Sequence, residues 1–336
     1  MTGGDETAPS GSSRDLTANA STVAFFSFFP PSNRERVVSV QVKHLRKSYG
    51  SFEAVRDLSL EVPTGSLFAF LGANGAGKST TIGCITTVLR PTSGTILVQG
   101  RDVVKDPGGV REVIGAVFQQ SLLDPLLTVR ENLAVRAGFY GLRRREAAGR
   151  IEELSALIGL EDFLDRRYGV LSGGQKRRAD IARAIIHRPS VVFLDEPTAG
   201  LDPQSREQIW SAIAELRVTR DTTVFLTTHY MEETERADRV CIIARGEIVA
   251  EGTPVELRST FSRSVLTVRA ADVATLLAEC DARGLTAEHL GDTVRVPVDR
   301  IEQARAILHS PQVTDFEFRH GTMDDVFLNV TGGQAA

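Results

Sequence analysis

The stretch Gly72-Ala73-Asn74-Gly75-Ala76-Gly77-Lys78-Ser79 decides the fold of this chain. It matches the pattern G-x-x-x-x-G-K-[ST], in which glycines let consecutive backbone N–H groups curl around phosphate oxygens. Lys78 can then reach the β- and γ-phosphates of a nucleotide, and the Ser79 hydroxyl can be a ligand of Mg²⁺. The apolar run 67–71 precedes the loop and suits a buried strand, and Thr80-Thr81-Ile82 can open a helix after it. Strand, glycine-rich loop and helix in this order predict a P-loop.

A second glycine-rich motif, Leu171-Ser172-Gly173-Gly174-Gln175, stands directly before a helical pattern over residues 179–187. A Gly-Gly turn at a helix N-terminus presents free N–H groups at the positive end of the helix dipole, which attracts phosphate. Ser-Gly-Gly alone is as compatible with an ordinary junction between a loop and a helix. The complete pentapeptide is much rarer on composition. The apolar run 191–194 follows it as a buried strand that ends in Asp195 and Glu196, so we interpret the motif as a second phosphate site.

In combination these motifs resemble those of the ATP-binding-cassette (ABC) ATPases, and they occur in that family's order between residues 38 and 254. The resemblance implies an α/β fold with a mostly parallel sheet core, an antiparallel β layer and a helical subdomain, and it implies ATP and Mg²⁺ as cofactors. The matched positions are Tyr49 (A-loop), Gly72 to Thr80 (Walker A), Gln119 (Q-loop), Leu171 to Gln175 (signature), Val191 to Glu196 (Walker B and the acid after it), Ala199 to Asp202 (D-loop) and His229 (switch histidine).

The resemblance also implies a role for each matched residue. Glu196 would be the general base that polarises the attacking water, and His229 and Lys78 would contact the phosphates. Gln119 would sense both the metal and the water. The residues implied to hold Mg²⁺ are Ser79, Gln119 and Asp195. Those implied to bind ATP are Tyr49, Gly72, Ala73, Asn74, Gly75, Ala76, Gly77, Lys78, Ser79, Thr80, Ser172, Gly173, Gly174, Gln175 and Asp202.

Some of these positions have simpler interpretations that stay open. Gln120 stands beside the predicted sensor, so the assignment could be displaced by one residue. Tyr49 precedes a glycine and could be an ordinary turn residue. His229 follows an apolar strand, where a histidine is commonly a structural residue at the strand end. Asp202 is suited to cap a helix with Pro203 at the first helical position. A capping role and a role at a subunit interface are compatible.

Composition limits the remaining function classes. The chain has 336 residues and a formal net charge of −4, which gives no electrostatic case for nucleic acid as a partner. Cys84, Cys241 and Cys280 are widely spaced and form no CxxC pair. This spacing favours reduced thiols over a disulfide framework or a metal site.

Hydropathy predicts no membrane-spanning helix, because no segment approaches the run of about 18 apolar residues that one needs. The nearest candidate, residues 23–29, lacks the basic segment and the small-residue cleavage pattern of a signal peptide. The resemblance therefore implies a peripheral protein at the cytoplasmic face of the cell membrane, cytoplasmic when unassembled. The membrane-spanning permease would be a separate polytopic chain.

Pattern and composition divide the chain into three parts. Residues 1–36, rich in Gly, Ser, Thr and Ala, are predicted to be a disordered extension, and residues 37–256 the ATPase domain with a helical subdomain at about 121–185. Residues 263–332 are predicted to form a small α+β domain. The expected core strands are 67–71, 116–119, 191–195, 223–227 and 240–244. The expected helices of the subdomain are 129–140, 145–158 and 160–164. The C-terminal domain is expected to be a β-α-β-α-β array with strands at 264–269, 293–298 and 314–319.

The final segment, residues 323–332, resembles the ending of ABC ATPases of the daunorubicin-resistance type, which export drugs. The resemblance implies an ATPase subunit that powers export of a drug, antibiotic or lipid-like cargo. It also implies a head-to-tail dimer of this chain with itself or a close homologue, with ATP held between Walker A of one subunit and the signature of the other. A soluble ABC ATPase that is not coupled to transport and an importer ATPase are the alternatives, and the C-terminal ending favours export.

Overall fold

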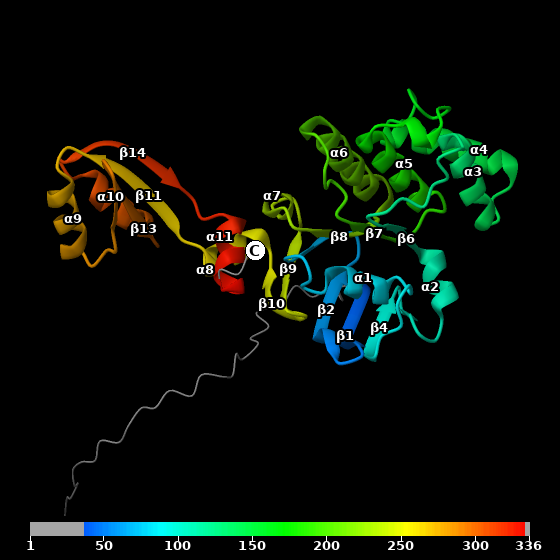
Figure 1. The fold of residues 1–336 in the computed structure, drawn as a ribbon, viewed down its shortest axis with the longest axis horizontal. Coiled ribbons are helices and arrows are strands. Elements are labelled where there is room, and N and C mark those ends of the chain that lie inside the picture. The colour runs from blue at the N-terminus through cyan, green and yellow to red at the C-terminus, as the bar shows by residue number, and fades with distance from the viewer. Residues whose placement is uncertain (1–36, 333–336) are drawn as a thin grey trace, which may run out of the picture. The chain divides into compact units, whose positions relative to one another are not determined.

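The computed structural model describes residues 37–332, which form three β-sheets and their associated helices (Figure 1). The extension predicted to be disordered, residues 1–36, lies outside this range. Among residues 37–332 no helix combines the length and the apolar character that crossing a membrane requires.

The central sheet has six strands in the order β10-β9-β3-β8-β7-β6. Its strands are β3 (Leu67–Leu71), β6 (Ile114–Val117), β7 (Val191–Asp195), β8 (Thr223–Thr228), β9 (Arg239–Ala244) and β10 (Glu247–Gly252). Neighbouring strands run parallel except for the antiparallel β9–β10 hairpin. The predicted strand at 116–119 is displaced, because pairing with β7 ends at Val117 and the polar residues Gln119 and Gln120 follow in the loop.

Alternate residues of the central strands enter two different cores, which explains why these strands are apolar throughout. Leu67, Ala69 and Leu71 pack with the buried side of the helices on one face. Phe68 and Phe70 pack on the other face with the antiparallel layer. The rings of Phe68, Phe70 and Phe193 surround that of Phe225, with centroids 5.1, 5.6 and 5.4 Å from it.

The antiparallel layer is a sheet in the order β2-β1-β4-β5. Its strands are β1 (Val38–Tyr49), β2 (Phe52–Pro63), β4 (Ser93–Val98) and β5 (Arg101–Asp102). Helices α1 (Lys78–Ile85) and α2 (Pro107–Val113) follow β3 and β5. A turn of two residues joins β1 to β2, so Tyr49 and Phe52 face each other across the hairpin.

The region between β6 and β7 is helical, as predicted. It contains α3 (Val129–Phe139), α4 (Arg144–Ile158) and α5 (Gly173–Ile185), with a short 3-10 turn η1 (Tyr168–Val170) before α5. The predicted helix at 160–164 is wrong. Gly159 ends α4 in the left-handed conformation at φ 69°, and Leu160, Phe163 and Leu164 then enter the core from turns.

The C-terminal region contains one strand more than predicted. Its elements are β11 (Ser264–Ala270), α9 (Val273–Ala282), β12 (Glu288–Leu290), β13 (Thr293–Val298), α10 (Ile301–Leu308) and β14 (Val313–Arg319), and the sheet order is β12-β13-β11-β14. The extra strand β12 is a three-residue edge strand with exposed side chains, so it has no apolar alternation that a sequence pattern could reveal.

The last helix, α11 (Met323–Thr331), packs against α8 (Pro254–Phe261) and α7 (Met231–Thr234). Its buried residues Met323, Val326 and Phe327 belong to the same apolar cluster as Leu67 of β3. The core of the small sheet is a separate cluster around Leu266 and Val296. The end of the chain therefore stabilises the central domain directly.

Candidate active site

The predicted site residues follow adjacent parallel strands. The P-loop follows β3, the two acids end or follow β7, Gln119 lies after β6, and His229 follows β8. Because β3, β8, β7 and β6 are neighbours, their carboxyl ends bring these segments to one edge of the sheet.

The P-loop wraps around its own lysine. Lys78 is the first residue of α1, is only 5% exposed, and its Nζ donates to the carbonyl oxygens of Gly72 at 2.7 Å and Ala73 at 3.1 Å. Gly77 has φ 109°, and a Cβ there would come within 2.7 Å of the Ala54 carbonyl oxygen, so the turn requires glycine. Burial lowers the pKa of Lys78, and the charges of Glu196 and Asp195 partly oppose that shift.

We expect Lys78→Ala to weaken ATP binding by about 30-fold or more, because a charge-assisted contact to phosphate is lost in a buried site. Its melting temperature without nucleotide should stay within a few degrees of the parent, since the lowered pKa means that burying this ammonium has a cost. Titration calorimetry and thermal unfolding measure both quantities. Lys105→Ala removes an exposed lysine and is the control; unchanged ATP affinity in Lys78→Ala would contradict the assignment.

A hydroxyl and a carboxylate meet beside the loop. Ser79 Oγ donates to Asp195 Oδ2 at 3.4 Å, and both groups offer the hard oxygen atoms that suit Mg²⁺. Within residues 37–332 no cluster of three or more His, Cys, Asp or Glu side chains could hold a metal by itself. The Ser79 hydroxyl and the Asp195 carboxylate fit a magnesium ion that takes few protein ligands and binds together with nucleotide phosphates.

Glu196 lies between the lysine and the histidine. Its Oε1 is 3.9 Å from Lys78 Nζ and 3.2 Å from His229 Nδ1, although the second pair lacks the alignment of a hydrogen bond. The backbone of Glu196 is left-handed at φ 48°, which is unfavourable for a residue with a Cβ. Its N–H donates to both the carbonyl oxygen and Oγ1 of Thr227, at 3.2 and 3.1 Å.

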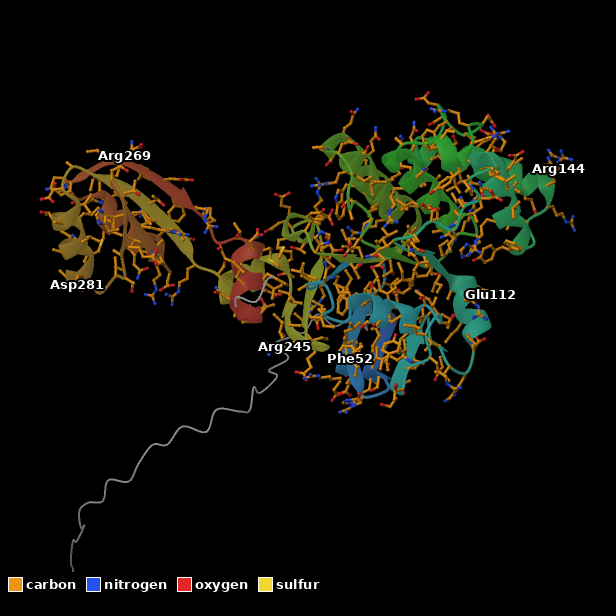
Figure 2. All side chains as sticks on the ribbon, in the orientation of Figure 1. Phe52, Glu112, Arg144, Arg245, Arg269 and Asp281 are labelled. Carbon is orange, nitrogen blue, oxygen red and sulfur yellow. The ribbon has the colours of Figure 1, made fainter. Side chains whose placement is uncertain are left out.

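Lys78, Ser79 and Glu196 line one cleft of about 240 Å³, which we call the P-loop cleft, whereas Asp195 and His229 lie beside Ser79 and Glu196 and do not line it. Two aromatic side chains stand at its mouth, Tyr49, 47% exposed, and Phe52, 63% exposed. Phe52 is labelled in Figure 2 and was not predicted from the sequence, because a single phenylalanine has no motif of its own. The residues lining the P-loop cleft are Tyr49, Phe52, Ala54, Asn74, Gly75, Gly77, Lys78, Ser79, Thr80, Gln119 and Glu196.

The second phosphate motif does not line the P-loop cleft. Ser172 caps α5 by accepting from Gln175 N at 3.3 Å, and Gln175 Oε1 accepts from Ser172 N at 3.1 Å. A Cβ on Gly174 would lie 2.4 Å from Ser205 Oγ, so this glycine allows α5 to approach α6 (Pro203–Arg220). Ser172 and Gly173 are exposed.

Asp202 is also outside the P-loop cleft and caps α6, as its alternative interpretation predicted. Its carboxylate accepts from Ser205 N at 2.9 Å and from Ser205 Oγ at 2.6 Å. The side chain remains exposed, so the capping role leaves an interface role possible.

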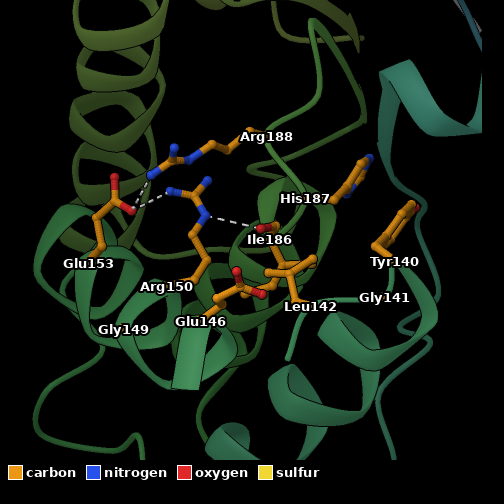
Figure 3. Close-up of a pocket in the computed structure, with 10 residues that line it drawn as sticks. All are labelled: Tyr140, Gly141, Leu142, Glu146, Gly149, Arg150, Glu153, Ile186, His187 and Arg188. Atoms are coloured by element: carbon orange, nitrogen blue, oxygen red, sulfur yellow. Dashed lines mark hydrogen bonds and ion pairs between the residues drawn. The ribbon is translucent and has the colours of Figure 1, made fainter. Parts of the chain in front are cut away.

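A larger groove lies in the helical region and contains none of the predicted site residues (Figure 3). The rings of Tyr140 and His187 stack there with centroids 3.8 Å apart. Burial lowers the pKa of His187 to about 4, so its imidazole is neutral at pH 7. Arg150 Nη1 and Arg188 Nη2 donate to the carboxylate of Glu153 at 2.6 and 3.1 Å. The groove is therefore a structural feature of the helical region and not part of the P-loop site.

Comparison with known proteins agrees with this geometry. The sequence profile of the ABC transporter family matches residues 55–199. The daunorubicin/doxorubicin resistance ATP-binding protein DrrA of Streptomyces peucetius is 38% identical over 318 residues, which is 90% of this chain and 95% of that protein. The Nod factor export ATP-binding protein I of Burkholderia lata is 38% identical over 298 residues, 88% of this chain and 98% of that protein.

Solved structures give the same result. The dimeric structure of MJ0796, a bacterial ABC transporter cassette, is 28% identical with a TM-score of 0.59 and covers 64% of this chain and 98% of its own. The same cassette is known as a dimer in a post-hydrolysis state bound to ADP and phosphate. The chain therefore belongs to the ABC transporter family, as an ATP-binding subunit with the ATPase activity that is coupled to transport.

Proposed function

We propose that two cassettes of this kind close head to tail around ATP and power an exporter. The observation that carries the proposal is the incomplete P-loop cleft. It holds the Walker A loop, Gln119 and Glu196, but no residue of the signature lines it. Ser172 and Gly173 are exposed at the N-terminus of α5, where free N–H groups can meet phosphate. A second cassette, either this chain or a close homologue, would supply the missing signature.

Each residue has a distinct task in the proposed reaction. Lys78 and the loop N–H groups bind the phosphates, and Ser79 and Asp195 would hold Mg²⁺, which when bound neutralises charge on the transferring phosphoryl group. Glu196 orients the attacking water and accepts its proton. His229 stabilises the charge that develops on the γ-phosphate. Gln119, which lines the P-loop cleft, would contact the metal and the water.

The membrane partner would dock on the helical region. Several apolar side chains are exposed there, among them Leu122 at 64%, Leu126 at 75% and Phe139 at 77%. Single exposed apolar residues are ordinary, but Leu122 and Leu126 closely follow Gln119 in the sequence, which favours a partner that responds to nucleotide. We propose a separate polytopic permease as this partner, with the chain at the cytoplasmic face of the membrane.

Export is the direction that the relatives favour. One of them is named for daunorubicin and doxorubicin resistance and another for Nod factor export. A drug, antibiotic or lipid-like molecule is therefore the proposed cargo class.

A tagged Glu196→Gln variant should recover this partner from membranes solubilised in mild detergent with ATP, because slowed hydrolysis holds the assembled state. We expect mass spectrometry to find a polytopic membrane protein in near-equal amount. The Lys78→Ala variant, handled identically, is the control that should lose the ATP-dependent part of the recovery. Recovery of ribosomes, or of no membrane protein, would contradict a transport role.

A further inference from the structure

Arg177 lies on the signature helix α5 and joins it to the two loops that hold the catalytic machinery. It is buried, and its guanidinium donates to four backbone carbonyl oxygens. These are Pro197 O from Nε at 2.9 Å, Phe118 O from Nη1 at 2.7 Å, and Asp195 O and Glu196 O from Nη2 at 2.5 and 2.9 Å. One side chain thus contacts both the end of β7 and the end of β6.

The chemistry of arginine explains why this residue type is used. Its planar fork offers five N–H donors in fixed directions, whereas a lysine ammonium is a single rotating centre that cannot span two loops. Burial lowers the pKa of Arg177, and the charges of Asp180 and Asp195 partly oppose that shift. A buried guanidinium has lost its contacts with water, so its hydrogen bonds to backbone carbonyls replace them. Such bonds are well placed to fix the positions of the backbone.

Glu196 is the residue that most needs such support. Its left-handed backbone at φ 48° is held at the N–H by Thr227 and at the carbonyl by Arg177. With the N–H and the carbonyl both held, the direction in which the side chain leaves the backbone toward the P-loop cleft is fixed. The loss of either contact should allow the residue to relax away from this conformation.

The same helix holds the segment around Gln119 from its other side. Asp180, one turn after Arg177, is buried and accepts from Ser121 Oγ at 2.6 Å and from Tyr168 OH at 3.1 Å. Phe118 and Ser121 flank the predicted sensor at positions 119 and 120. Two buried side chains of α5 therefore hold the Q-loop at both ends.

We propose that Arg177 is a positioning residue, which aligns Glu196 from the helix that carries the signature and is itself anchored by its bond to Phe118 O. The inference rests on the proposed role of Glu196 as the base. It assigns to the signature helix a task within its own subunit in addition to the contact with the partner's nucleotide.

The test compares Arg177→Lys with Arg183→Lys in the full chain with Mg-ATP. Arg183 is a matched control, because it is a buried arginine on the same helix that donates to a strand carbonyl, Ala116 O, at 2.5 Å. We expect Arg177→Lys to lower kcat about 30-fold with KM and ATP affinity changed less than about twofold, and Arg183→Lys to stay within about threefold of the parent. Equal losses of kcat in the two variants would indicate a merely structural role and overturn the proposal.

A double-mutant cycle with Glu196→Gln shows whether Arg177 acts through the base. In that background Arg177→Lys should change the residual rate by less than about threefold and leave ATP-driven dimerisation intact. A further loss of about 30-fold would overturn the proposal. If Arg177→Lys has a normal kcat while Glu196→Gln is slow, this inference alone is overturned. If Glu196→Gln itself turns over ATP at a normal rate, the base role on which the inference rests is overturned. If Arg177→Lys melts more than about 10 °C below the parent, Arg177→Gln replaces it in the same comparisons.

Discussion

Glu196→Gln should slow ATP turnover about a thousandfold while ATP affinity changes less than about threefold. The amide has the size of the carboxylate but cannot accept a proton from water, and it keeps the contacts that position the phosphates. Lys78 remains in its loop, because its hydrogen bonds go to the carbonyls of Gly72 and Ala73 and not to this residue. We therefore expect kcat to fall while the ATP-binding isotherm stays unchanged.

The same variant should accumulate as a dimer when ATP is added, since the closed state is normally released by hydrolysis. Sedimentation velocity with and without Mg-ATP measures this directly. Glu232→Gln makes the same chemical change at an exposed acid on α7, three residues after His229, and should leave both turnover and association unchanged. Near-normal ATPase activity of Glu196→Gln would remove Glu196 from the role of base.

Much of the site could be predicted because its parts are contiguous in sequence. A phosphate loop needs a fixed run of glycines, and an acid pair at the end of an apolar strand is readable from a single segment. The convergence of Gln119, Glu196 and His229 follows from parallel strands, because β6, β7 and β8 bring their carboxyl ends to one edge. Parallel strand direction places each group at that edge, and the strand order in the sheet, which the sequence alone did not predict, makes them neighbours.

The parts that could not be predicted depend on packing between distant segments. Arg177 belongs to the run Lys176-Arg177-Arg178, which by charge alone suggests a solvated helix face. Only its spacing from Gly174 and Ile181 places it on the buried face. Phe52 reaches the P-loop cleft because a tight hairpin sets it opposite Tyr49. The strand β12 has exposed side chains and forms only through pairing with β13.

Ser172→Arg tests the two-subunit site and should reduce ATP turnover at least about a thousandfold. The exposed serine starts the signature helix, and a long cationic side chain there would occupy the space that the partner's phosphates need. The P-loop cleft contains no signature residue, so ATP binding by the single subunit should change less than about threefold. Combined with Glu196→Gln, the substitution should also abolish the dimer that forms on adding ATP.

Ser172 has a structural role as well, and a control separates it from the interface. Its Oγ accepts from Gln175 N and caps α5, and loss of such a cap costs about 1 kcal/mol. Ser172→Ala loses the cap without adding bulk, so it should melt slightly lower than the parent but retain at least a third of the turnover. If Ser172→Arg kept normal ATP turnover, each subunit would hydrolyse ATP without the signature of a partner. A loss as large in Ser172→Ala as in Ser172→Arg would instead assign the effect to the helix cap.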